Sequence, residues 1–188
     1  ATSALWYQIY AEDGLDPLEL RRAVDAGAKA VCITVTDTGI DWESIDLLRK
    51  LIDIPLLVKG ILNVKDAENV IQRGLNGIVV SNHGASVEQP RRSPIEVLPL
   101  IADAVHERVP ILIDGSFRRG TDVLKALALG ARAVLVARPL MWGLAAYGAS
   151  GVQTVLEILY NQLARSMAAA GRPRIPMIDR TLVRIDTR

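Results

Sequence analysis

The chain alternates short apolar runs with longer amphipathic segments, and this alternation restricts the fold more than any other sequence feature. Six runs rich in β-branched residues predict strands, at residues 5–10, 30–35, 55–58, 77–80, 110–113 and 133–136. Between them, apolar residues recur every third or fourth position, as in helices with one buried face, at residues 17–26, 42–51, 64–73, 93–106 and 121–129. Runs that are apolar on both faces and are separated by helices indicate a parallel α/β sheet.

Two α/β architectures are compatible with this repeat. A closed (β/α)8 TIM barrel needs eight strands, whereas this chain predicts six, followed by a helical tail over residues 140–171. Because Trp6 already lies in a strand, we expect residues 1–188 to form one barrel domain that supplies strands 3 to 8 and lacks its N-terminal part. The alternative is an open doubly wound sheet, which the lack of a GxGxxG motif after the first strand disfavours.

Composition excludes several classes of function. With 22 basic and 21 acidic residues, the chain has no excess of positive charge for a nucleic acid or an anionic membrane surface. No apolar run approaches the ~20 residues of a membrane span, so we expect a cytoplasmic protein. The single cysteine, Cys32, lies within an apolar run and is predicted to be a buried core thiol. The sequence shows no metal-ligand cluster and no nucleophile elbow.

A glycine-rich turn after the fifth run predicts a phosphate site. Residues 114–120 read Asp-Gly-Ser-Phe-Arg-Arg-Gly, which places a carboxylate at a strand end and Arg118 just before a helix. Such a turn exposes backbone amides to an anion. The next run ends in Ala137-Arg138, and in a barrel Arg138 would lie beside Arg118. The alternative is an ordinary turn with solvated arginines.

Other polar residues follow the carboxyl ends of predicted strands, where α/β barrels carry their chemistry. Lys59 closes one run and could stabilise negative charge on a cofactor ring or an oxyanion. His83 follows the next run, whereas the second histidine, His106, falls at a helix end and is expected at the surface. On the first strand, alternation places Gln8 and Tyr10 on one face. A structural role is the alternative for each of them.

Taken in order, these stretches resemble the FMN-dependent α-hydroxy acid oxidases and dehydrogenases, the family of glycolate oxidase, lactate oxidase and mandelate dehydrogenase. The matching stretches are Trp-Tyr-Gln-Ile-Tyr (6–10), Leu-Val-Lys-Gly-Ile-Leu (57–62), Ser-Asn-His-Gly-Ala (81–85), Asp-Gly-Ser-Phe-Arg-Arg-Gly-Thr-Asp-Val (114–123), Lys-Ala-Leu-Ala-Leu-Gly-Ala-Arg-Ala-Val (125–134) and Ala-Arg-Pro (137–139). The resemblance runs from Trp6 to about residue 171.

The resemblance implies that FMN lies across the mouth of the barrel. Its implied contacts are Gln8, Thr34, Lys59 and Ser81 at the ring, Asp114 and Arg118 at the ribityl chain and phosphate, and Gly115, Ser116, Ala137 and Arg138 around the phosphate. The implied catalytic residues are His83, Tyr10 and Lys59. His83 would take the substrate hydroxyl proton as hydride passes from the α-carbon to flavin N5, and Tyr10 would hydrogen-bond the substrate. Lys59 would stabilise negative charge at the flavin N1/O2 edge. The resemblance further implies a small-molecule substrate, oxygen or an electron carrier as acceptor, and a homo-oligomer, a tetramer in the family.

Three departures from the family pattern affect the substrate. Where the family has an Arg-Gln pair after the histidine, with the arginine holding the substrate carboxylate, this chain has Ser86 and Val87. Arg91 or Arg92 could take the place of that arginine only if correctly placed. Thr36 stands where the family has an aspartate that orients the histidine, with Asp37 one residue late.

The third departure is a loop that shrinks to residues 37–41. Ser116 and Ala137 also replace family glycines, changes small enough to preserve phosphate binding. A substrate without a free carboxylate is therefore one expectation, such as a related alcohol or amine. Two other functions stay open at this point: a flavin-binding scaffold or inactive fragment of the same fold, and a phosphate-binding barrel without flavin.

Overall fold

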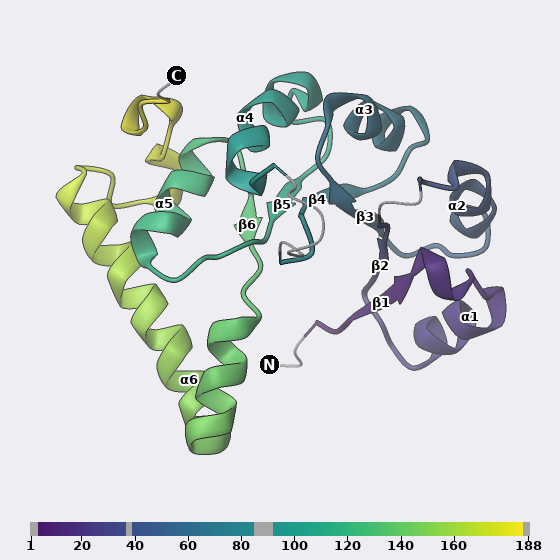
Figure 1. The fold of residues 1–188 in the computed structure, drawn as a ribbon, viewed down its shortest axis with the longest axis horizontal. Helices are drawn as coiled ribbons and strands as arrows, with labels where there is room; N and C mark the ends of the chain where they lie inside the picture. Colours follow the sequence, from purple (N-terminus) through teal and green to yellow (C-terminus); the bar gives the residue numbers. More distant parts are fainter. Residues whose placement is uncertain (1–3, 37–38, 85–91, 186–188) are drawn as a thin grey trace.

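The described residues, 4–36, 39–84 and 92–185 of a computed structural model, form a single parallel sheet with helices outside it (Figure 1). The strands are β1 (Trp6–Tyr10), β2 (Ala30–Thr34), β3 (Leu56–Ile61), β4 (Gly77–Val80), β5 (Ile111–Ile113) and β6 (Ala133–Val134). Each strand pairs in parallel with the next along the chain. A doubly wound sheet reverses its strand order at a switch point, and this one does not. The order is that of consecutive barrel strands.

Six α-helices in the described residues accompany the strands, and their starts follow from local sequence. They are α1 (Pro17–Asp25), α2 (Trp42–Arg49), α3 (Val64–Gln72), α4 (Pro94–Val105), α5 (Gly120–Ala128) and α6 (Arg138–Ala169). Asp16, Asp41 and Asn63 accept hydrogen bonds from first-turn backbone N–H groups at 2.9, 3.1 and 2.8 Å, which satisfies donors that a helix start leaves without a partner. Helices α1 to α5 follow an arc outside the strands (Figure 1).

Buried side chains form two cores, one on each face of the sheet. The larger core lies between sheet and helices and takes alternate residues of each strand, for example Val31 and Ile33 of β2. The inner core is smaller and contains Ala30, Cys32, Leu57, Val79 and Leu112, with Leu135 packed against it. Cys32 is therefore a buried free thiol, as predicted. At the carboxyl end of the same face of β2 the next residue is Thr34, so this inner face changes from apolar to polar.

The structure differs from the sequence expectation in three places. Strand β3 continues through Lys59 to Ile61, beyond the predicted run of residues 55–58. The last predicted strand shortens to Ala133–Val134, because β6 pairs with a single neighbour, β5, among the described residues. The predicted tail helix begins at Arg138 and is interrupted, since Tyr147 and Gly148 have non-helical backbone angles. The two halves of α6 fold back on each other there, as Figure 1 shows at its lower edge.

No helix in the described parts of the chain is both long enough and apolar enough to cross a membrane.

Candidate active site

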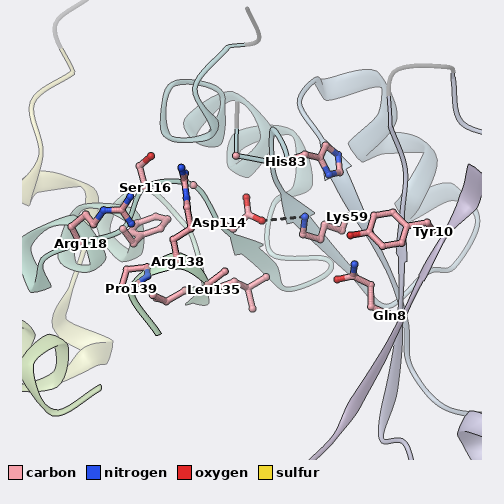
Figure 2. A pocket seen from close by; sticks show the side chains of 15 residues that line it. Gln8, Tyr10, Lys59, His83, Asp114, Ser116, Arg118, Leu135, Arg138 and Pro139 are labelled. Atoms are coloured by element: carbon pink, nitrogen blue, oxygen red, sulfur yellow. Dashed lines mark ion pairs between the residues drawn. The ribbon is translucent and has the colours of Figure 1, made fainter. Parts of the chain in front are cut away.

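A cavity of about 610 Å³ lies at the carboxyl ends of the strands, within the range of pockets that bind small molecules and cofactors (Figure 2). It is lined by Gln8, Tyr10, Lys59, His83, Gly84, Asp114, Gly115, Ser116, Phe117, Arg118, Leu135, Val136, Ala137, Arg138 and Pro139. These residues come from β1, β3 and the loops after β4, β5 and β6, which parallel pairing brings to one edge. The structure thus brings many of the predicted residues together at one edge of the sheet.

The side chains that line the cavity differ in chemical character from one end to the other. In Figure 2, Arg118 and Ser116 lie at one end, Arg138 and Asp114 follow, and Lys59, His83, Gln8 and Tyr10 lie at the other end. Positive guanidinium groups therefore gather at one end, and a lysine, a histidine and a phenol gather at the other. A carboxylate stands between the two groups.

Lys59 is held by two partners. Its Nζ lies 3.2 Å from Asp114 Oδ2 and donates a hydrogen bond to Ser81 Oγ at 3.0 Å. The Ser81 hydroxyl is fully buried and also accepts the His83 backbone N–H at 3.2 Å. Since both side chains of the ion pair are mostly shielded from water, 14% and 20% exposed, the ammonium position is well defined. Ser81 thus connects Lys59 to the turn that carries His83.

The His83 imidazole packs against a glycine on the neighbouring strand. A Cβ on Gly60 would lie 2.9 Å from His83 Nε2 and would collide with the Val35 carbonyl oxygen. Gly60 also has a φ of +112°, a conformation that glycine adopts without strain. His83 itself has a φ of +56°, which is uncommon outside glycine. The lack of a side chain at Gly60 therefore leaves room for the His83 ring to pack against the backbone.

Two buried oxygen atoms at the site lack a hydrogen-bond partner among the described residues, Asp114 Oδ1 and Thr34 Oγ1. Buried polar atoms are nearly always paired in folded proteins, and exceptions often mark a ligand position. Asp114 uses one carboxylate oxygen for Lys59 and leaves the other available. A ligand with hydroxyl groups would satisfy it. Thr36 Oγ1, on the same strand end, is likewise buried without a described partner.

At the other end, the anion-binding capacity comes from side chains. Arg118 and Arg138 have no carboxylate within ion-pair distance in the described residues. The expectation that the α5 start offers its amides to a phosphate is wrong for residues 118–120. The amides of residues 118 and 119 donate to Asp122 Oδ2 at 3.0 and 2.9 Å, and Gly120 N–H donates to Gln162 Oε1 at 3.0 Å.

The Cys32 thiol lies beneath the ion pair and stays protonated. Burial raises the pKa of Cys32 to about 11, Lys59 lowers it in part and Asp114 raises it. The inner core is therefore uncharged directly under the polar layer. In the described residues, no group of three or more His, Cys, Asp or Glu side chains is placed to hold a metal ion.

Most predicted site residues converge on this cavity. The cavity-lining ones are Gln8, Tyr10, Lys59, His83, Asp114, Gly115, Ser116, Arg118, Ala137 and Arg138. Thr34 and Ser81 are fully buried next to them rather than lining the cavity. Arg92 is exposed and does not line it. Ser86, Val87, Asp37 and Arg91 lie outside the described residues. Sequence reasoning missed Asp122 and Gln162, and also Leu135, whose alternation with Ala133 could have indicated the inner face.

The fold and the cavity define the chain as part of a (β/α) barrel with a cavity, lined by two arginines at one end, at the carboxyl ends of its strands. Comparison with known proteins narrows this class. The family model for FMN-dependent dehydrogenase matches residues 34–185, so the chain belongs to that family.

Relatives and solved structures agree with this assignment. The chain is 49% identical over 160 residues to 2-hydroxyacid oxidase 1 of Homo sapiens, which covers 85% of this chain and 43% of that protein. It is 43% identical over 174 residues to the peroxisomal (S)-2-hydroxyacid oxidase GLO4 of Arabidopsis thaliana, covering 93% of this chain and 48% of that protein. A mandelate oxidase structure with (S)-2-phenylpropionate has a TM-score of 0.85 at 35% identity, covering 95% of this chain and 62% of that chain. The chain thus spans less than half the length of these two curated relatives.

Proposed function

We propose that the cavity binds FMN and that the protein oxidises a small hydroxy acid or a related alcohol or amine. One observation carries this proposal. The cavity holds, in order, guanidinium groups, a carboxylate with a buried unpaired oxygen, and a lysine beside a histidine. This order matches the order of phosphate, polyol and ring in FMN. A mandelate oxidase mutant that is 38% identical to this chain, solved with a monooxide FMN adduct, supports the same ligand.

Each part of FMN meets groups suited to it. Arg118 and Arg138 would hold the phosphate by charge-assisted hydrogen bonds, with Gly115, Ser116 and Ala137 around it. Asp114 Oδ1 would accept a hydrogen bond from a ribityl hydroxyl, which would give this buried oxygen the partner that it lacks among the described residues. Gln8, Thr34, Lys59 and Ser81 would contact or flank the ring.

The residues at the ring end would act on the substrate. Bound FMN would supply the hydride acceptor. His83 would take the proton of the substrate hydroxyl, for which a base must come within hydrogen-bond distance. Tyr10, which is 46% exposed at the cavity edge, would hydrogen-bond the substrate. Lys59, whose position is fixed by Asp114 and Ser81, would stabilise negative charge on the adjacent edge of the flavin ring.

Substrate and acceptor are proposed at a coarser level. The relatives named above are 2-hydroxyacid oxidases and a mandelate oxidase, which supports small hydroxy acids as the first class to test. The replacement of the family's carboxylate-binding arginine by Ser86 keeps substrates without a carboxylate in the test. Oxygen or an electron carrier would take the electrons onward.

The remaining expectations stay predictions. They are a cytoplasmic location, although one relative is named peroxisomal, a homo-oligomeric assembly, and a single barrel domain over residues 1–188.

The test uses the two histidines as a matched pair, since both occupy left-handed backbone positions that asparagine tolerates. The protein is loaded with FMN and mixed anaerobically with hydroxy acids, alcohols and amines, and bleaching of the visible flavin absorption is followed. His83→Asn should bind FMN and lose at least about 100-fold in the rate of bleaching. His106→Asn, exposed at the end of α4, should behave as wild type.

The outcomes separate the alternatives. Unchanged bleaching in His83→Asn would remove His83 from its role as base. Wild-type protein that binds FMN but is reduced by none of the substrates would support the scaffold alternative. Protein that binds inorganic phosphate but no flavin would support the barrel without flavin.

A further inference from the structure

Arg118 contacts an aromatic ring from a distant part of the chain. Its guanidinium carbon lies 4.5 Å from the centroid of the Trp142 ring, a cation–π distance. Trp142 lies on α6 and does not line the site cavity, and it is 56% exposed. It lines instead an adjoining apolar groove of about 530 Å³, in which Arg118 and Pro139 also take part. Arg118 therefore lies at the boundary between cavity and groove.

The contact leaves Arg118 able to bind an anion. A guanidinium group interacts with an aromatic ring through the face of the ring, while its five N–H donors lie in its own plane. In the described residues it has no ion-pair partner that an incoming phosphate would have to displace. A long, flexible side chain that is already placed loses less freedom on binding than a freely rotating one.

The same helix places Trp142 and Arg138 together. Arg138 is the first residue of α6 and Trp142 follows four positions later, so both side chains lie on one face of the helix. Trp142 thus lies one helical turn after Arg138 and contacts Arg118. The face of the Trp142 ring is the negative part of the aromatic quadrupole. It therefore offsets part of the repulsion between Arg118 and Arg138, which line the same cavity.

A close helix crossing fixes the position of Trp142. A Cβ on Gly143, the next residue, would lie 2.6 Å from the Gly151 carbonyl oxygen, so the two halves of α6 meet backbone to backbone there. Gly143 is buried, which holds this turn of the helix in place although the Trp142 side chain is exposed.

From these contacts we infer that Trp142 is a positioning residue for the phosphate end of the site, acting through Arg118. The inference rests on the proposed function, because it assumes that the phosphate of FMN binds at Arg118. It predicts that loss of the Trp142 ring weakens binding of FMN but not of riboflavin. Riboflavin has the same flavin ring and polyol as FMN but no phosphate.

The test measures dissociation constants of FMN and riboflavin by quenching of flavin fluorescence. Trp142→Leu removes the aromatic face and keeps apolar bulk, whereas Trp142→Phe retains an aromatic face. In Trp142→Leu the dissociation constant for FMN should rise about two- to fivefold, the range expected for an exposed cation–π contact, with riboflavin unchanged. Trp142→Phe should restore most of the FMN affinity. In an Arg118→Ala background, Trp142→Leu should have no further effect.

Three results would overturn the inference while leaving the proposed function intact. One is an unchanged FMN affinity in Trp142→Leu. Another is an equal loss for FMN and riboflavin, which would indicate a general structural role. The third is a full effect of Trp142→Leu in the Arg118→Ala background. Wild-type protein that binds neither flavin would instead refute the proposed function, and the inference with it.

Discussion

Two residues of the site hold backbone conformations that side chains make unfavourable. His83 has a φ of +56° and Ser116 a φ of +62°, and both line the cavity. Left-handed conformations outside glycine are uncommon and are often found where a protein positions functional groups. The strain at Ser116 can be tested directly, because glycine adopts this conformation without strain.

Ser116→Gly should stabilise the protein. Removing the Cβ relieves a left-handed conformation that costs about 1 to 2 kcal/mol, and part of the gain is lost because glycine makes the unfolded chain more flexible. We expect the free energy of unfolding in urea to rise by up to about 1 kcal/mol. The matched control is Ala164→Gly, at an exposed position within α6, which should lower the free energy of unfolding by about 1 kcal/mol. A destabilised Ser116→Gly protein would show that the hydroxyl makes a compensating contact.

Cys32 should make stability depend on pH in the alkaline range. Burial raises the pKa of its thiol to about 11, so the folded protein holds the thiol proton more tightly than the unfolded chain does. The contribution of Cys32 to stability is complete below the unfolded pKa of about 8.5 to 9 and is lost as pH rises through about 11. Wild type should lose up to about 3 kcal/mol more than Cys32→Ala over this interval, measured by urea unfolding at each pH. Parallel pH curves for the two proteins would contradict the shift.

The convergence of several cavity-lining residues could be predicted from sequence, because each lies at or shortly after the carboxyl end of a strand. Lys59 lies near the end of β3, Asp114 follows β5, and His83 and Arg138 follow β4 and β6 within a few residues, so parallel pairing brings them together. The residues that support them could not be predicted in the same way. Gln162 lies 42 positions from the Gly120 amide whose N–H it accepts, and Trp142 contacts Arg118 although helix α5 and strand β6 lie between them in the chain. Nothing in the local sequence of α6 indicates either contact.

At the scale of elements, α5 and α6 form one unit that carries Arg118 and Arg138 at one end of the cavity. The start of α5 lies flush against α6, since a Cβ on Gly120 would collide with the backbone of Gln162 and would lie 2.7 Å from Leu163 Cα. The Gln162 side chain accepts the Gly120 N–H at the same point. The turn that carries Arg118 is thus positioned by a helix that follows it in the chain.

Gly120→Ala should separate these helices. The added methyl group meets backbone, which cannot rotate away as a side chain can, so we expect the free energy of unfolding to fall by about 2 kcal/mol or more. Thr121→Ala, exposed one residue later, should change it by less than about 0.5 kcal/mol. Urea unfolding followed by circular dichroism makes the comparison. Equal effects of the two substitutions would mean that α6 shifts to accommodate the methyl group without cost.

The elements themselves were mostly predictable, and the exceptions have local causes. The helix starts after Asp16, Asp41 and Asn63 follow from side chains that cap them. The break in α6 was missed because Gly148 stands in an apolar, helix-like stretch, where glycine is unfavourable but tolerated. Strand β6 is shorter than its apolar run because hydrogen bonding, and not hydrophobicity, determines strand length.

At the scale of the whole molecule, the cavity draws residues from the first described strand to the last. Gln8 and Tyr10 lie on β1, and Arg138 follows β6. A ligand in this cavity would therefore contact residues on or next to both outer strands of the described sheet, β1 and β6. Because it can bind only when the sheet has formed, its binding energy adds to the stability of the entire fold.

FMN should raise the thermal midpoint of unfolding. At a free concentration about 100 times its dissociation constant, a ligand specific for the folded state adds about 2.7 kcal/mol. For a chain of this size we expect an increase of roughly 5 to 10 °C by differential scanning fluorimetry. Arg138→Ala, an exposed substitution at the α6 start, should reduce this increase and leave the midpoint without ligand nearly unchanged. An equal increase in both proteins would place the phosphate elsewhere.

The crossing of Gly143 with Gly151 has a consequence for how the sequence can vary. Neither residue lines the site cavity, yet a side chain at either position would push the halves of α6 apart and move Trp142 away from Arg118. Selection for cofactor binding would then act on two positions that a search by distance from the ligand overlooks. Natural variants should keep both residues as glycine, or change them together, even where the residues that touch the ligand differ.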